Sequence, residues 1–151
     1  MNTNPNYYHT SKFDLYLATS QLANSGFGVY TREHIPPNTL VDEYYGTITS
    51  ILGGSYVLYI KDGCYIDALG YPRCFMAMIN DASFVPKKTI RKKKKKIDIT
   101  PDANYDVNNN KLINNCEFVI DKENSKAYIH TICDIPAGSE LFVSYGPDYW
   151  N

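Results

Sequence analysis

Apolar and polar residues alternate along most of the chain, in short stretches rich in β-branched and aromatic residues. A period of two is typical of β-strands that bury one face. The pattern predicts strands over residues 12–17, 39–45, 56–60, 116–120 and 126–132, with Gly, Pro, Asn and Asp in the turns between them. Residues 71–79 instead crowd apolar side chains with alanine and methionine, which predicts one short helix. We therefore expect a mainly β domain.

Two features interrupt this pattern. The alternation fails over about residues 84–114, where a lysine run is followed by Asp, Pro and a cluster of Asn, and this composition predicts a mobile insertion. Similar turns begin at Ile35-Pro-Pro-Asn-Thr-Leu and Ile135-Pro-Ala-Gly-Ser-Glu-Leu. Two similar turns do not by themselves make a repeat.

Length and composition limit the class of protein. With 151 residues, 44% of them hydrophobic, the chain has the size of one domain. The first ten residues are polar, and the longest uninterrupted apolar run is 74–79, so we expect neither a signal peptide nor a membrane span. The four cysteines form no Cys-x-x-Cys pair, which predicts reduced thiols in an intracellular protein and no metal site.

The formal net charge of −1 conceals a segregation of charge. Eight of the fifteen basic residues are Lys87, Lys88, Arg91 and the lysines of 92–96, and the rest of the chain then carries a formal charge of −9. An acidic body is expected to attract a basic partner, whereas the stretch between Lys87 and Lys96 is expected to attract phosphate or another acidic surface. A solvated loop or a nuclear-localisation signal is the alternative, and commoner, interpretation of such a run.

Three short motifs have a structural and a functional interpretation. Gly26-Phe-Gly28 fits a tight bend before a strand better than a phosphate loop, which needs more glycines and a helix. Asn80-Asp81 follows the most apolar run and fits a turn. Among the fourteen tyrosines, Tyr145 stands out because it lies between Ser144 and Gly146 beside an apolar strand.

The order of the motifs is more informative than any one of them. Along the chain come Gly-x-Gly-Val-Tyr (26–30), Ile-Pro-Pro-Asn-Thr-Leu-Val-Asp-Glu-Tyr-Tyr-Gly (35–46), Tyr-Ile-Asp-Ala (65–68), Met-Ile-Asn-Asp (78–81), Asn-Asn-Cys-Glu-Phe (114–118), Asp-Ile-Pro-Ala-Gly-Ser-Glu-Leu (134–141) and Tyr145-Gly. This series resembles the SET domain, a family of lysine methyltransferases. The small size, without flanking cysteine-rich segments, is most similar to the compact SET proteins of large DNA viruses.

The resemblance implies a fold and a cofactor. It implies a single SET domain over residues 1–151, with its core at about 12–150, built of several small sheets, few short helices and a C-terminal knot-like segment. It also implies S-adenosylmethionine as cofactor. By position, the cofactor would be held by Gly26, Phe27, Gly28, Asn80, Asp81 and Trp150, with Tyr145 as the catalytic tyrosine that also touches the cofactor.

The lysine channel is implied less directly. Tyr56, Tyr59 and Tyr65 are candidates for its walls, because aromatic faces accommodate both the stem and the cationic head of lysine. Val143 stands where the family often has a larger aromatic residue, which favours room for more than one methyl group. No cysteine-rich segment follows Tyr145 in this sequence, so we expect Tyr149 and Trp150, helped by a second subunit in a homodimer, to complete the channel that a zinc-bound tail completes in many members of the family.

Two functions remain open at this point. The first is methyl transfer from S-adenosylmethionine to a lysine of a basic tail, with a histone as substrate, the lysine run on nucleosomal DNA and a location in the nucleus or host nucleus. The second is a catalytically silent SET-like module that binds a protein or nucleic acid. Asp81, where the family commonly has histidine, and the insertion favour the second function, whereas Gly26, Gly28, Asn80 and Tyr145 favour the first.

Overall fold

The computed structural model describes residues 5–51, 53–83 and 112–146. Most of the predicted insertion, as well as Tyr149 and Trp150, lie outside these described residues. In chain order the elements are β1 (Tyr7–Tyr8), β2 (Leu15–Thr19), β3 (Phe27–Thr31), β4 (Leu40–Glu43), β5 (Thr47–Thr49), β6 (Val57–Lys61), β7 (Cys64–Asp67), β8 (Arg73–Cys74), the 3-10 helix η1 (Phe75–Met78), β9 (Cys116–Asp121), β10 (Lys126–Thr131) and β11 (Glu140–Leu141).

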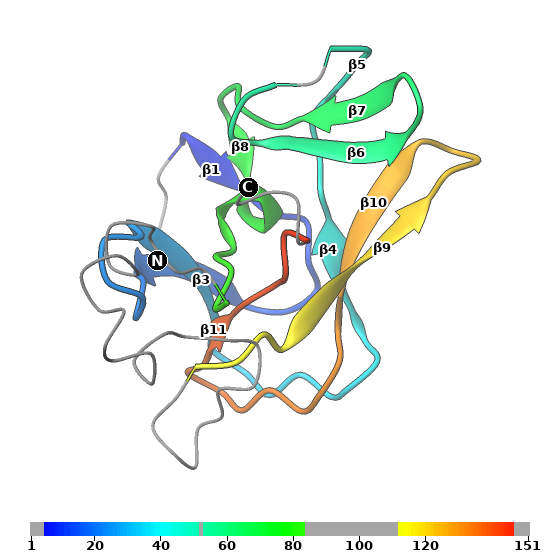
Figure 1. Cartoon of the computed structure of the whole chain (residues 1–151). Helices are drawn as coiled ribbons and strands as arrows, with labels where there is room; N and C mark the ends of the chain where they lie inside the picture. The colour runs from blue at the N-terminus through cyan, green and yellow to red at the C-terminus, as the bar shows by residue number, and fades with distance from the viewer. Residues whose placement is uncertain (1–4, 52, 84–111, 147–151) are drawn as a thin grey trace, which may run out of the picture.

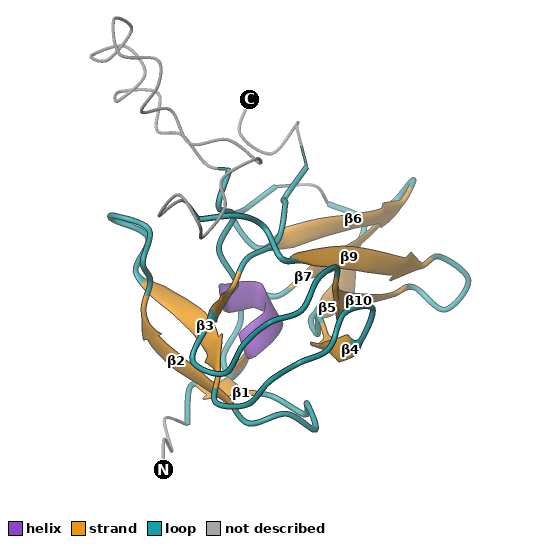
Figure 2. Ribbon diagram, turned by 90° about the horizontal axis from the view of Figure 1, so that it is seen from below, coloured by secondary structure: helices purple, strands orange, loops and turns teal. Residues whose placement is uncertain are grey.

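The described strands form four small sheets arranged around η1 (Figures 1 and 2). Three sheets have three strands each, in the orders β4-β10-β9, β11-β3-β2 and β5-β7-β6, and the fourth is the pair β1-β8. Strands from distant parts of the sequence are neighbours in two of the larger sheets, since β4 pairs with β10 and β3 with β11. The prediction of a mainly β fold of several small sheets is confirmed.

The sequence pattern predicted the positions of the strands better than that of the helix. Each of the five predicted strands overlaps an observed one. The predicted helix at 71–79 is wrong in its first part, where Arg73 and Cys74 form β8 and pair in parallel with Tyr7 and Tyr8. The Arg73 N–H donates to the carbonyl of Asn6, so the backbone there is engaged in a sheet, and only one 3-10 turn follows.

The two similar turns contact each other. Ile35 and Ile135 exchange both of their backbone hydrogen bonds at 2.9 Å. Around them the pattern is reciprocal: Asn38 N–H donates to the Thr131 carbonyl, and Gly138 N–H donates to the Thr31 carbonyl. Both Asn38 and Gly138 have positive φ, at 53° and 88°. The resemblance between the turns is therefore also a spatial correspondence.

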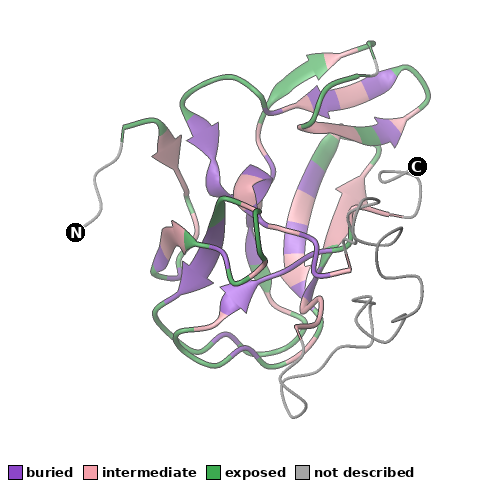
Figure 3. Cartoon of the chain, turned by 60° about the vertical axis from the view of Figure 1, so that its left-hand side comes forward, coloured by how far each residue is buried: buried purple, intermediate pink, exposed green. Residues whose placement is uncertain are grey.

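The C-terminal part of the described chain runs through the middle of the molecule. Phe142 forms a parallel bridge with Asn80, and Val143 forms one with Cys116. The Cys116 N–H donates to the Phe142 carbonyl, and the Val143 N–H donates to the Asn80 carbonyl. Phe142 and Val143 are thus held between the segment after η1 and the start of β9. The buried Val143 side chain joins one core with η1, β3 and β10, and Tyr145 packs against that core (burial is coloured in Figure 3).

Candidate functional site

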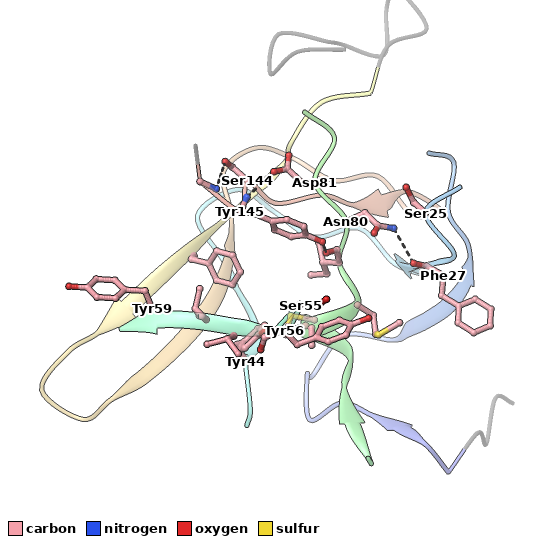
Figure 4. A pocket seen from close by; sticks show the side chains of 18 of the residues that line it. Ser25, Phe27, Tyr44, Ser55, Tyr56, Tyr59, Asn80, Asp81, Ser144 and Tyr145 are labelled. Atoms are coloured by element: carbon pink, nitrogen blue, oxygen red, sulfur yellow. Dashed lines mark hydrogen bonds between the residues drawn. The ribbon is translucent and has the colours of Figure 1, made fainter. Parts of the chain in front are cut away.

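A cavity of about 850 Å³ opens beside η1 and the C-terminal segment (Figure 4). It is lined by residues from five parts of the chain and by two further tyrosines. These are Leu22, Asn24, Ser25 and Phe27; Ser55 to Tyr59; Met76 to Asp81; Phe118 and Ile120; Ser144, Tyr145 and Gly146; and Tyr44 and Tyr65. A smaller hollow of about 410 Å³ shares the 22–27 lining and extends along Thr19 to Gly26.

Tyr145 is held at both its backbone and its hydroxyl. Its N–H donates to Asp81 Oδ2 at 2.9 Å, and its hydroxyl donates to the Ile79 carbonyl at 2.5 Å. The next residue, Gly146, turns the chain with a φ of 92°. Figure 4 shows the Tyr145 ring extending from the C-terminal segment toward the segment that carries Asn80. Because the Tyr145 hydroxyl donates its proton to the Ile79 carbonyl, the lone pairs of the phenolic oxygen can accept a hydrogen bond from a ligand.

Asp81 holds the backbone of Tyr145 and is itself held by several donors. The residue is 2% exposed, and its Oδ1 accepts hydrogen bonds from the Ser83 N–H, the Ser83 hydroxyl and the Asn114 amide. Its Oδ2 accepts the Tyr145 N–H. The carboxylate predicted to contact the cofactor is thus engaged by four protein donors, which hold the two ends of the insertion and the tyrosine together, although the residue itself lines the cavity.

Asn80 connects the cavity to the N-terminal part of the chain. Its Nδ2 donates to the Phe27 carbonyl at 3.0 Å, while the Phe27 ring points away from Tyr145 (Figure 4). The ring is 45% exposed and lies 6.3 Å from that of Tyr7. Of the sequence-predicted cofactor residues, Phe27, Asn80, Asp81 and Tyr145 therefore meet at this cavity.

The two glycines take different places. Gly26 has a φ of 63°, which favours glycine, and it lines the smaller hollow. Gly28 is not among the described residues that line either cavity. A Cβ on Gly28 would lie 2.1 Å from Glu140 Oε2, so the missing side chain leaves room for a buried carboxylate.

The tyrosines predicted as walls of the lysine channel all line this cavity, together with aromatic residues that the sequence did not single out. Tyr56, Tyr59 and Tyr65 all line the cavity. Tyr59 is half exposed, and its hydroxyl donates to Asp62, a bond that together with burial raises the Tyr59 pKa. Tyr44, which the sequence did not single out, donates its hydroxyl to the Tyr56 carbonyl at 2.8 Å.

The sequence also did not single out Phe118, which lines the cavity, or Arg73, which stacks on Tyr56 of the wall. Phe118 lies 5.8 Å from Tyr44, edge to face, and its alternation with Ile120 on β9 was the one available signal. Arg73 is 6% exposed, and its guanidinium lies 4.3 Å from the Tyr56 ring and 4.4 Å from the Tyr71 ring. Two of its nitrogens donate to the Leu69 carbonyl. Nothing in the local sequence marked this stack.

One predicted channel residue, Val143, does not line the cavity, and two further predicted residues lie outside the part of the chain that the structure describes. Val143 is 1% exposed, packs in the core and is not among the described lining residues. Tyr149 and Trp150 lie outside the described residues.

The described residues offer no set of metal ligands. No three side chains of His, Cys, Asp or Glu in this part of the chain are placed to hold a metal ion. All four cysteines carry free thiols, and burial raises the pKa values of Cys74 and Cys116. No helix within the described ranges is long and apolar enough to cross a membrane.

Comparison with known proteins points to one family. The model of the family described as "SET domain" matches residues 26–146. A search of curated proteins gave no significant match. Among solved structures, KRYPTONITE in complex with mCHG DNA and S-adenosylhomocysteine (SAH) matches with a TM-score of 0.62 and 19% identity, over 90% of this chain and 24% of that one. The chain thus spans about a quarter of the length of that protein, and the likeness at this identity concerns the fold.

Proposed function

The chain belongs to the SET-domain family, and from that premise we propose that it is an S-adenosylmethionine-dependent protein-lysine N-methyltransferase. The observation that carries the proposal is the fixed Tyr145 hydroxyl at a cavity which also contains Asn80 and an aromatic wall. The distant motifs at Asn80 and Tyr145 serve one site because Asp81 binds the Tyr145 backbone directly.

The cavity suits the proposed cofactor in size and in chemistry. A volume of about 850 Å³ is within the range of pockets that enclose ligands of this size. Asn24, Ser25 and Asn80 provide neutral polar groups at the 22–27 side, where an amino-acid moiety would be held, and Leu22 and Met78 provide apolar surface. When bound there, S-adenosylmethionine supplies an electrophilic methyl group on a sulfonium sulfur.

The residues of the chain then have distinct tasks. The Ile79 carbonyl holds the Tyr145 proton, so the phenolic oxygen accepts weak hydrogen bonds from C–H groups or from an amine and orients them. Methyl transfer is an in-line displacement, and holding donor and acceptor near attack distance removes much of its entropic barrier. The wall of Tyr44, Tyr56 and Phe118 excludes water from the incoming lysine.

The same wall assists loss of the lysine proton. Desolvation disfavours the charged ammonium and lowers the pKa of the amine, so no strong protein base is needed. Aromatic faces also accommodate the methylated cationic products. Tyr59 and Tyr65, whose rings lie 5.7 Å apart and which both line the cavity, would receive the lysine stem.

The distribution of charge along the chain supports a proposal for its substrate, its partners and its location. The acidic body supports a substrate with a basic tail, and we propose a histone. The lysine run between Lys87 and Lys96, outside the described residues, would contact nucleosomal DNA through its phosphates, and the protein would act in the nucleus or host nucleus. A compact SET protein of viral type and a homodimer whose partner completes the channel belong to the same proposal.

The silent-module alternative loses one of its supports. Asp81 was an argument for it, but the four hydrogen bonds to the Asp81 carboxylate give that residue a structural task that an active enzyme would equally need. The insertion, its other support, lies outside the described residues.

Incubation with methyl-labelled S-adenosylmethionine and core histones tests the proposal. We expect label on histone lysines, located by mass spectrometry, and heat from SAH binding in calorimetry. If label appears neither on histone nor on the protein itself, and no SAH binds, the enzyme proposal is wrong and the binding module remains.

A further inference from the structure

A buried carboxylate lies beneath the loop that forms one side of the cavity. Glu140, at the start of β11, is 2% exposed. Its Oε2 accepts the Ser20 hydroxyl at 2.7 Å. Its Oε1 accepts the Gln21 N–H at 2.9 Å and, more weakly, the Gln21 side-chain amide at 3.4 Å. Glu140 is 119 residues or more from these donors in sequence, so a tertiary contact fixes the start of the loop.

The Ser20 hydroxyl extends this contact by one residue. While it donates to Glu140, it accepts the Leu22 N–H at 3.1 Å. The loop is also closed at its base, where the Ser20 N–H donates to the Gly26 carbonyl at 2.8 Å. Three consecutive residues, Ser20 to Leu22, are therefore held by one carboxylate, directly or through a hydroxyl.

The surroundings of Glu140 are built to admit it. Gly28 supplies the space, because a Cβ there would overlap the carboxylate. Within the part of the chain that the structure describes, no Lys, Arg or His nitrogen lies within salt-bridge distance of Glu140. Burial of an unpaired carboxylate is costly unless hydrogen bonds compensate it. The hydrogen bonds that Ser20 and Gln21 donate from the loop offset this cost, and Tyr30 on β3 also interacts with the carboxylate, so the burial of Glu140 and the conformation of the loop depend on each other.

The backbone of Glu140 is held by Asn115, away from the loop. Its carbonyl accepts the Asn115 amide at 3.0 Å, and the Asn115 side-chain oxygen accepts the Phe142 N–H at 2.8 Å. The segment that leads to Tyr145 is therefore the support from which the carboxylate reaches the loop. Leu22, Asn24 and Ser25, which this loop carries, line both cavities.

We propose that Glu140 is a positioning residue for the loop at residues 20–26, and that it sets the affinity of the site for S-adenosylmethionine without touching it. This inference rests on the proposed methyltransferase function only for the identity of the ligand. The loop positioning itself is a property of the free protein.

The test replaces Glu140 by Gln, which keeps the shape but loses the charge and one acceptor. Because hydrogen bonds to a charged group are among the stronger ones, we expect KM for S-adenosylmethionine and Kd for SAH to rise about tenfold. We expect kcat and KM for the peptide to change less than about twofold. Glu123→Gln, at an exposed position of the β9–β10 turn, is the matched control and should change none of these values.

Two further measurements keep the proposal open to refutation. Ser20→Ala removes the link to Leu22 and should weaken SAH binding in the same direction, with less than additive effect in the Glu140→Gln background. Hydrogen exchange at the Gln21 and Leu22 amides should accelerate in Glu140→Gln without any ligand. If Glu140→Gln does not fold, the Ser20→Ala variant decides alone.

The outcomes are distinguishable. Unchanged SAH affinity and unchanged amide exchange in Glu140→Gln would overturn the proposal. A lower Tm together with a lower kcat and a similar rise in both KM values would also overturn it, because it would indicate a purely structural residue. If the wild-type protein binds no SAH, the proposed function fails instead. In that case the exchange of the Gln21 and Leu22 amides still decides whether Glu140 positions the loop.

Discussion

Replacement of Asp81 by Asn tests whether this residue supports the site or impairs it. In the wild-type protein Oδ1 accepts three hydrogen bonds and Oδ2 accepts the Tyr145 N–H. An asparagine has one acceptor oxygen, which the three donors at the Oδ1 side, from Ser83 and Asn114, would take. Its NH₂ group would then face the Tyr145 N–H, donor against donor.

The size of the effect follows from leaving one buried donor unsatisfied. That loss costs about 1–3 kcal/mol, which for a chain of this length lowers Tm by about 5 °C. Because the affected donor belongs to Tyr145 itself, we also expect kcat to fall. Thermal denaturation followed by circular dichroism measures the first effect, and methyl transfer to a peptide measures the second.

Ser83→Ala is the matched control. It removes one donor from the Oδ1 side and leaves the bond to Tyr145, so a loss of about 1 kcal/mol with kcat unchanged is expected. The reasoning is refuted if Asp81→Asn is as stable as the wild-type protein. It is refuted equally if Asp81→His, which introduces the residue common in the family, raises turnover, because Asp81 would then be an impairment.

Three further predictions concern single groups. Tyr145→Phe should lower kcat strongly and cost only about 1 kcal/mol of stability, since one hydroxyl bond to Ile79 is lost; unchanged turnover would mean that another tyrosine acts. Burial, and next the charge of Glu140, raises the pKa of Tyr30 to about 12, so its stabilisation is complete below pH 10 and lost as the pH rises toward 12. Ultraviolet titration should show a lower Tyr30 pKa in Glu140→Gln, and an unchanged pKa would mean that the Glu140 carboxylate does not lie beside Tyr30. Deleting residues 92–96 should weaken DNA binding and reduce its salt dependence while peptide turnover persists, and loss of peptide turnover would place the run in the active site.

Local patterns were sufficient where local physics decides the structure. Alternation located β10 because every second residue of that strand is buried, β-branched and aromatic content located β4, β6 and β9, and the turn residues set their ends. The helix prediction failed at Arg73 because the partner of that backbone is Asn6, which no window around residue 73 contains. The pairing of Ile35 with Ile135 was equally invisible locally, although the similar turns were noticed.

The site was predicted in part for the same reason. Asn80 and Tyr145 were found because they belong to motifs that keep their order along the chain. Tyr44, which lines the cavity, and Arg73, which stacks on Tyr56, were missed because neither has a distinctive spacing in the sequence, and their positions result from tertiary packing. Glu140 was present in a quoted motif, but only the fold reveals that its carboxylate reaches Ser20.

A crystal structure of the protein with SAH tests the central claim most directly. The account predicts the ligand in the 850 Å³ cavity, with its amino-acid end near Asn80 and its sulfur facing the Tyr145 hydroxyl. A ligand bound elsewhere, or a sulfur turned away from Tyr145, would contradict it.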